Sequence, residues 1–179
     1  MSEFKSIFID SAKEHNIEQY PTMTKDFYDI TPENVFNETG CQIFKNGETC
    51  ESYLLYEKKL YILGKGFGGY GVVDITTCDF DKNGENEILY TYSWGSGLHR
   101  SIIAYFDFSN KSEVEVKVSS PQPSKFIKRD LVFKKLSNTE IEVYTAKING
   151  LNFGKLGIQK DKLFGEIKAV DNKPVLFIK

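Results

Sequence analysis

Short runs of β-branched and aromatic residues recur along this chain, and turn dipeptides separate many of them. The runs occupy residues 54–56, 60–63, 72–78, 88–94, 102–108, 113–118, 131–136 and 141–148. Turn formers stand at Asn46-Gly47, Ser137-Asn138, Asn149-Gly150 and Asp171-Asn172. Many short strands with regular turns are typical of an all-β domain. The pattern therefore predicts a mainly β fold, an antiparallel β-sandwich or barrel-like single domain with a short N-terminal helix.

The helical period is confined to the beginning of the chain. Phe4, Ile7, Phe8 and Ala12 recur at near-helical spacing, which predicts a helical segment within residues 1–19. We expect residues 20–179 to form a single β-rich domain. Residues 119–124, rich in Ser and Pro, are a long crossing loop or a weak domain boundary.

The charge of the chain is unevenly distributed. Residues 1–110 hold 9 basic and 17 acidic side chains, whereas residues 111–179 hold 14 basic and 8 acidic ones, for an overall charge of −2. Arg100 and Arg129 are its only arginines. Arginine supplies most bidentate contacts to bases and phosphates, so we expect no nucleic-acid partner.

Apolar runs and cysteines limit the class of protein further. The longest apolar runs are far too short to span a membrane, and no apolar signal segment follows Met1. This predicts a cytoplasmic protein as written, or an extracytoplasmic one if a leader has been removed. Three cysteines are too few for a disulfide framework, and the sequence leaves open whether Cys41 and Cys50 pair. Oligomeric state is equally open.

Residues 79–87, DFDKNGENE, carry the most specific chemical pattern. Oxygen ligands at alternate positions of a tight loop converge on one point, and a glycine at position 6 permits the sharp turn. The pattern predicts that Asp79, Asp81, Asn83, the backbone carbonyl of Glu85 and Glu87 bind Ca²⁺. An EF-hand is excluded, because position 12 is Tyr90 and the flanking segments read as strands. The alternative is a polar turn without an ion, since Asp, Asn and Gly are common turn formers.

The surroundings of this loop resemble an FG-GAP or VCBS-type repeat. The resemblance covers Gly66-Phe67-Gly68 through Trp94-Gly95-Ser96 and includes the Phe-Gly pair, the acidic loop and the apolar strand that follows. In that family the repeats build β-propellers, commonly extracellular, in which calcium rigidifies each loop. A single copy excludes a multi-bladed propeller, so the resemblance implies the loop and a structural Ca²⁺.

A second group of residues suggests a ligand surface. Tyr92 and Trp94 alternate along one predicted strand, and His99 and Arg100 follow a Gly-rich bend; Tyr70 ends another Gly-rich stretch. Together they could hold a protein or glycan, although such an aromatic stripe can also be core packing.

These features predict a non-enzymatic binding module in which one calcium loop orders the neighbouring Gly-rich and aromatic segments as a recognition edge. One alternative is a small hydrolase that uses His99 with nearby Ser or Asp residues. Another is an accessory protein in which the loop is only a structural turn.

Overall fold

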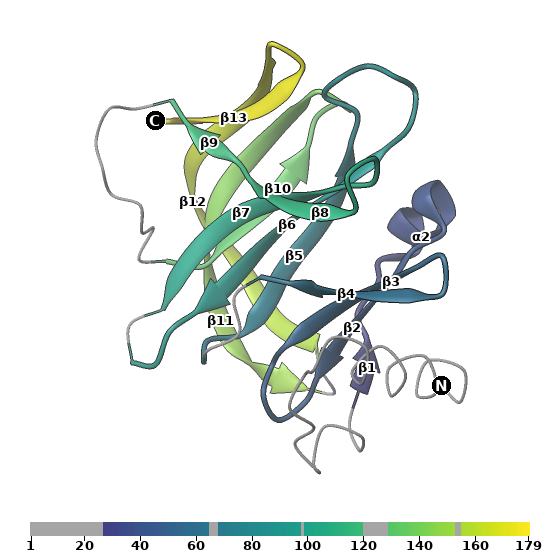
Figure 1. Ribbon diagram of the computed structural model, residues 1–179. Helices are drawn as coiled ribbons and strands as arrows, with labels where there is room; N and C mark the ends of the chain where they lie inside the picture. Colours follow the sequence, from purple (N-terminus) through teal and green to yellow (C-terminus); the bar gives the residue numbers. More distant parts are fainter. Residues whose placement is uncertain (1–26, 65–67, 98, 120–128, 153–154) are drawn as a thin grey trace.

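The computed structural model describes residues 27–64, 68–97, 99–119, 129–152 and 155–179, which form three β-sheets and one short helix (Figure 1). The helix expected within residues 1–19 lies outside these ranges, as do residues 120–124 of the expected crossing loop. None of the described residues belongs to a helix with the length and apolar character needed to cross a membrane.

The first sheet is an antiparallel meander that a helix interrupts. Its strands follow the chain order: β1 (Phe27–Asp29), β2 (Gln42–Asn46), β3 (Ser52–Tyr56) and β4 (Lys59–Leu63). Helix α2 (Glu33–Thr39) connects β1 to β2 and ends at Gly40, whose φ is 68°. Glu57 and Lys58, both with positive φ, make the two-residue turn that the sequence predicts between β3 and β4.

The other two sheets contain the remaining strands. The middle sheet runs in chain order through β5 (Gly71–Cys78), β6 (Glu87–Trp94), β7 (Arg100–Asp107) and β8 (Ser112–Glu115). The third sheet has the order β10 (Leu131–Lys135), β11 (Glu140–Asn152), β12 (Lys155–Val170), β13 (Lys173–Ile178) and β9 (Lys117–Val118). Only the β13–β9 pair of the three sheets is parallel among the described strands.

The middle sheet is covered on both faces. Along β6, Ile88 and Tyr90 pack with side chains of the first sheet in one buried cluster. Leu89 packs with side chains of the third sheet in a second cluster, and the Thr91 hydroxyl donates to the backbone oxygen of Leu131 at 2.7 Å. Alternate residues of a strand point to opposite faces, so β6 has no solvent face along most of its length. Two buried clusters on one sheet thus hold the three sheets together.

The segment 113–118 differs from its prediction. Its alternating sequence predicts one half-buried strand with the valines inside, but the chain divides at Val116 between β8 of the middle sheet and β9 of the third sheet. Glu113 turns toward the core instead. Its carboxylate accepts hydrogen bonds from the Gly64 N–H at 2.6 Å and the Tyr90 hydroxyl at 2.5 Å. A buried polar group needs such partners, and these outweigh the alternation.

Two predicted turns also need correction. Asn149-Gly150 lies within β11, where the pairing with β12 shifts register between Ile148 and Leu151. Asn46-Gly47 opens a longer loop, because the Asn46 side chain accepts the N–H groups of Glu48 and Thr49. The turns at Ser137-Asn138 and Asp171-Asn172 join β10 to β11 and β12 to β13, as predicted.

The mainly β class is confirmed, and the strand pairs are mostly antiparallel. The barrel-like alternative is wrong for the described residues, because none of their sheets closes on itself. The antiparallel sandwich stays a prediction, since three sheets share the core. Cys41, Cys50 and Cys78 are all buried free thiols, so Cys41 and Cys50 do not pair.

Candidate functional site

The segment predicted to bind calcium connects β5 to β6 and is folded around its own side chains. Both carboxylate oxygens of Asp79 accept backbone N–H groups, from Asn83 at 3.1 Å and from Gly84 at 3.2 Å. Asp81 accepts the Asn83 N–H at 3.1 Å, and the side-chain oxygen of Asn83 accepts the Glu85 N–H at 2.7 Å. Gly84 takes a φ of 88°, which favours glycine. The side chains at positions 1, 3 and 5 therefore turn in over the loop.

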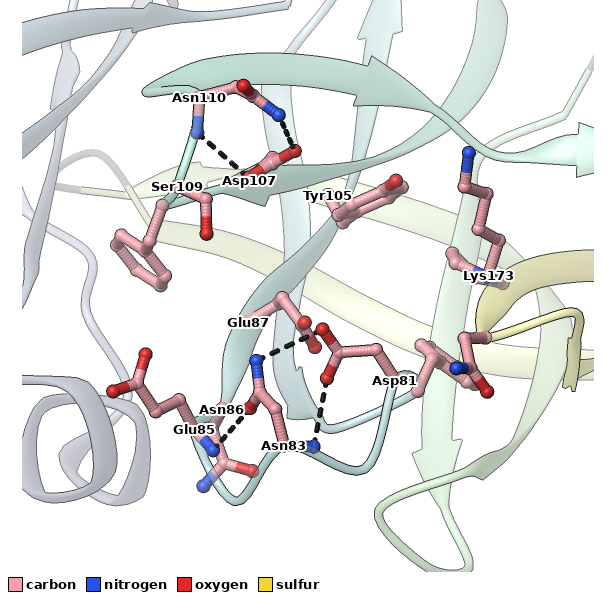
Figure 2. A pocket seen from close by; sticks show the side chains of 14 residues that line it. Asp81, Asn83, Glu85, Asn86, Glu87, Tyr105, Asp107, Ser109, Asn110 and Lys173 are labelled. Carbon is pink, nitrogen blue, oxygen red and sulfur yellow. Dashed lines mark hydrogen bonds between the residues drawn. The ribbon is translucent and has the colours of Figure 1, made fainter.

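Glu87 closes the loop at the first residue of β6. Its half-buried carboxyl group points toward Asp81 (Figure 2). Burial, followed by repulsion from Asp81 and Asp79, raises the pKa of Glu87 to about 7. The negative charges of this loop thus oppose one another, and a bound cation would relieve that repulsion.

Two other parts of the chain hold the loop in place. The Asp79 N–H donates to the backbone oxygen of Asn138, in the β10–β11 turn, at 2.8 Å. The Asn86 side chain donates to Glu38 of helix α2 at 3.2 Å, and the same Glu38 oxygen accepts the Thr77 hydroxyl of β5. Elements of all three sheets or their connections therefore converge on the candidate loop.

The loop also forms one wall of a pocket of about 260 Å³. The opposite walls come from Tyr105 and Asp107 at the end of β7, Asn110 in the turn before β8, and Lys173 at the start of β13 (Figure 2). The Asp107 carboxylate accepts the Asn110 backbone N–H at 3.0 Å and its side-chain N–H at 2.7 Å. Burial alone would raise the pKa of Asp107, but the hydrogen bonds from Asn110 and Ser109 and the charge of Lys173 outweigh it and lower the pKa. Polar groups dominate this pocket.

The loop does not form a complete metal-binding site in this structure. Among the described residues, no group of three or more His, Cys, Asp or Glu side chains is arranged to hold a metal ion. The acidic oxygens of the loop instead accept its own N–H groups. A cation would have to compete with these N–H groups for the oxygens of Asp79 and Asp81.

The residues predicted to bind a ligand lie at the other end of β6. Tyr70 contacts His99 edge to face, with ring centroids 4.6 Å apart. Arg100 lies over the Trp94 ring at 5.0 Å from its centroid. Tyr92, in contrast, is buried with 1% of its surface exposed, so it packs the core in this structure. The structure thus groups four of the five residues in two pairs.

This placement corrects one prediction. Glu87 begins β6 and Trp94 ends it, which separates the acidic loop from the aromatic segment by roughly 23 Å at the usual rise per strand residue. The Gly-rich stretch lies with the aromatic segment, since Gly68 bridges to Gly95. An ion in the loop therefore cannot order those two segments by direct contact.

His99 also bears on the hydrolase alternative. Its Nδ1 lies 4.0 Å from the Asp130 carboxylate, at the limit of an ion pair. Ser93 and Ser101 face each other on neighbouring strands but are each only 1% exposed. In the described part of the chain, the contacts of His99 are with the Asp130 carboxylate and the Tyr70 ring, and neither is a hydrogen bond from a hydroxyl or thiol nucleophile.

Several residues of the pocket are not among the site residues that the sequence predicts. Asp107 and Asn110 have the spacing of a polar turn, which could have been recognised as such. Lys173 reaches the pocket only because β13 belongs to the third sheet. Glu38 does not line the pocket, and it contacts the loop residue Asn86 because α2 packs beside β5. Long-range packing of this kind cannot be deduced from local patterns.

Comparison of the chain with protein-family models, with curated proteins and with solved structures gives no match. The resemblance to an FG-GAP or VCBS-type repeat therefore stays a prediction that rests on the residues of the loop.

Proposed function

We propose that this protein is a non-enzymatic binding module in which residues 79–87 bind one Ca²⁺ and order a recognition edge for a protein or glycan. The edge is the polar pocket beside the loop, not the aromatic segment at the other end of β6. The ion is structural in this proposal: it holds the loop wall of the pocket in one conformation.

The observation that carries the proposal is the inward turn of Asp79, Asp81 and Asn83 beside the raised pKa of Glu87. Three carboxylates, an amide oxygen and the Glu85 carbonyl form a hard oxygen donor set, which suits Ca²⁺. Binding draws Glu87 toward the ion and favours its charged form. The energy for this movement comes from the attraction between Ca²⁺ and the carboxylates, which outweighs their mutual repulsion.

The pocket supports the recognition half of the proposal. It offers the Tyr105 ring, the side chains of Asn86 and Asn110, and the ammonium group of Lys173. An aromatic face with amide and charged groups around it can stack on a sugar ring and hydrogen-bond its hydroxyl groups, or receive a polar peptide side chain. The loop contributes Asp81, Asn83 and Glu87 to the same lining, so an ion there would fix one wall of the pocket.

Calcium titration of two matched variants tests the metal site. Asp81 and Asp107 both line the pocket, but only Asp81 belongs to the loop. We expect Asp81→Asn to weaken Ca²⁺ binding by about tenfold or more, because it removes one ligand charge. Asp107→Asn should leave the affinity within about twofold. Equal affinities in both variants and the wild type, measured by isothermal titration calorimetry, would contradict the assignment.

A glycan array and a peptide array, each probed in Ca²⁺ and in EDTA, test the recognition edge. Specific binding should disappear in EDTA and in Tyr105→Ala, and persist in His99→Ala at the other end of β6. Binding that survives EDTA, or that requires His99 instead of Tyr105, would place the recognition surface elsewhere.

A further inference from the structure

Lys45 of β2 is an unusually buried lysine, with 1% of its surface exposed. Lysine is almost never fully buried unless it is paired with an acid. Among the described residues Lys45 forms no ion pair; its Nζ donates to the backbone oxygen of Val72. That oxygen lies beside the register shift between Val72 and Asp74 in β5. An ammonium group has three N–H donors, so the bond to Val72 alone leaves the charged form of Lys45 incompletely hydrogen-bonded.

A second pocket, of about 140 Å³, is lined by Lys45. One wall is Ile30, which follows β1, together with Val73, Asp74 and Ile75 of β5; the other is the end of the β11–β12 hairpin, with Leu156 and Ile158. Lys155 stands on the same hairpin end and is exposed. Apart from Lys45, Lys155 and Asp74, the lining is mainly apolar, and Lys45 contributes to it although only 1% of its surface is exposed.

Burial changes the chemistry of that amine. It lowers the pKa of Lys45 to about 8, while the nearby thiol of Cys50 acts weakly in the opposite direction. At pH 7 roughly a tenth of such an amine is neutral, against about one part in two thousand for an ordinary lysine. Only the neutral amine is a nucleophile, and desolvation in an apolar pocket is one recognised way to activate a lysine.

We propose that Lys45 is a carbonyl-reactive site that binds a small apolar aldehyde as an imine. The lone pair of Nζ forms a bond to the carbonyl carbon as the carbon–oxygen π bond breaks, and one Nζ proton moves to the oxygen to give a carbinolamine. The carbon–hydroxyl bond then breaks, the hydroxyl group leaves as water with the second Nζ proton, and a carbon–nitrogen double bond forms. One amine and one aldehyde thus give one imine and one water, with no oxidant or reductant.

The pocket sets the size of the ligand. Cavities near 150 Å³ with apolar walls accommodate a molecule of the size of benzene. A short-chain aldehyde fits, whereas a sugar or a nucleotide does not. The site is separate from the acidic loop, and it stands whether or not that loop binds Ca²⁺.

Reductive trapping with butanal tests the proposal. Sodium cyanoborohydride converts each imine into a stable secondary amine, and peptide mass spectrometry then gives the rate at every lysine. Lys155 is the matched control, because it lines the same pocket from an exposed position. We expect Lys45 to react at least about tenfold faster than Lys155 at pH 7 in the native protein, and at the same rate in concentrated urea.

Two variants distinguish a loss of Lys45 reactivity from a loss of the folded structure. Lys45→Met should lose the fast modification and keep the slow one at Lys155. Ile158→Trp, which keeps Lys45 but enlarges a side chain of the pocket wall, should slow the reaction of Lys45 and leave that of Lys155 unchanged. A native Lys45 that reacts no faster than Lys155, or an Ile158→Trp protein with undiminished Lys45 reactivity, overturns the proposal.

Discussion

The two ends of β6 differ in their residues and in the interactions that hold them in place. At its start, the loop 79–87 is polar, largely exposed and bonded mainly to itself. At its end, Trp94 packs against the core, and the backbone of Gly69 comes so close to Ser93 that an added Cβ would lie 2.4 Å from its oxygen. One end is built by local hydrogen bonds, the other by close packing between distant segments.

The two ends of β6 also differ in how closely other atoms approach their glycines. Nothing lies within 4 Å of a Cβ added to Gly84, so the tip of the acidic loop is open. At the aromatic end, a Cβ added to Gly68 or Gly69 would meet backbone atoms of residues 93–96, although Gly97 is as open as Gly84. Close backbone packing therefore occurs at Gly68 and Gly69 and not at the tip of the acidic loop.

Alanine at two glycines gives the largest expected difference. Gly69 and Gly84 both have positive φ, of 73° and 88°, so the backbone strain of alanine is similar at each. Only Gly69→Ala also creates a backbone clash, and we expect it to lower the free energy of unfolding by about 3 kcal/mol or more, against about 1 kcal/mol for Gly84→Ala. Urea denaturation measures both. Equal losses would show that the two ends are not packed differently.

The pH dependence of the free energy of unfolding tests the environment of Glu87 at the acidic end. A carboxyl group whose pKa is raised on folding, as at Glu87, binds its proton more tightly in the folded state. Stability without calcium should then fall as pH rises from about 4.5 to about 7, by about 1–2 kcal/mol for this half-exposed group after allowance for solvent screening.

Glu87→Gln is the control for that slope, because it removes the titrating group and keeps its shape. Melting curves in EDTA between pH 4.5 and 8 should show a flatter pH dependence in this variant than in the wild type. An unchanged slope would mean that the Glu87 carboxyl group is not held near the charges of Asp79 and Asp81.

The smallest expected effect is at the aromatic end. His99→Ala removes the edge-to-face contact with Tyr70 and the weak pairing with Asp130, and we expect a loss of about 1 kcal/mol in unfolding free energy. The Ca²⁺ affinity should not change. A wild-type esterase or glycosidase activity that this variant abolishes would instead favour the hydrolase alternative.

The sequence predicts the parts of this molecule that depend on neighbouring residues. The turn at Asp171-Asn172 and the hydrogen-bonded loop after Asp79 both follow from side chains that bond to backbone groups a few positions away. The strand at 88–94 follows from its β-branched and aromatic residues.

The features that the sequence does not predict depend on which sheets pack together. Tyr92, predicted as ligand surface or core, is core because the first sheet covers the face of β6 that it shares with Ile88 and Tyr90. Lys45 is buried because β5 lies against its strand, and nothing in the sequence near it indicates this. The division of 113–118 between two sheets has the same origin.

Thermal unfolding in excess EDTA and in a calcium series, with magnesium as the control, tests the central claim most directly. An ion that binds only the folded state stabilises it by RT ln(1 + [L]/Kd), about 2.7 kcal/mol at a hundredfold excess over Kd. We predict a saturable rise in Tm that calcium produces far more effectively than magnesium and that Asp81→Asn weakens. A Tm that is the same in EDTA and in millimolar calcium would contradict the account and leave residues 79–87 as a polar turn.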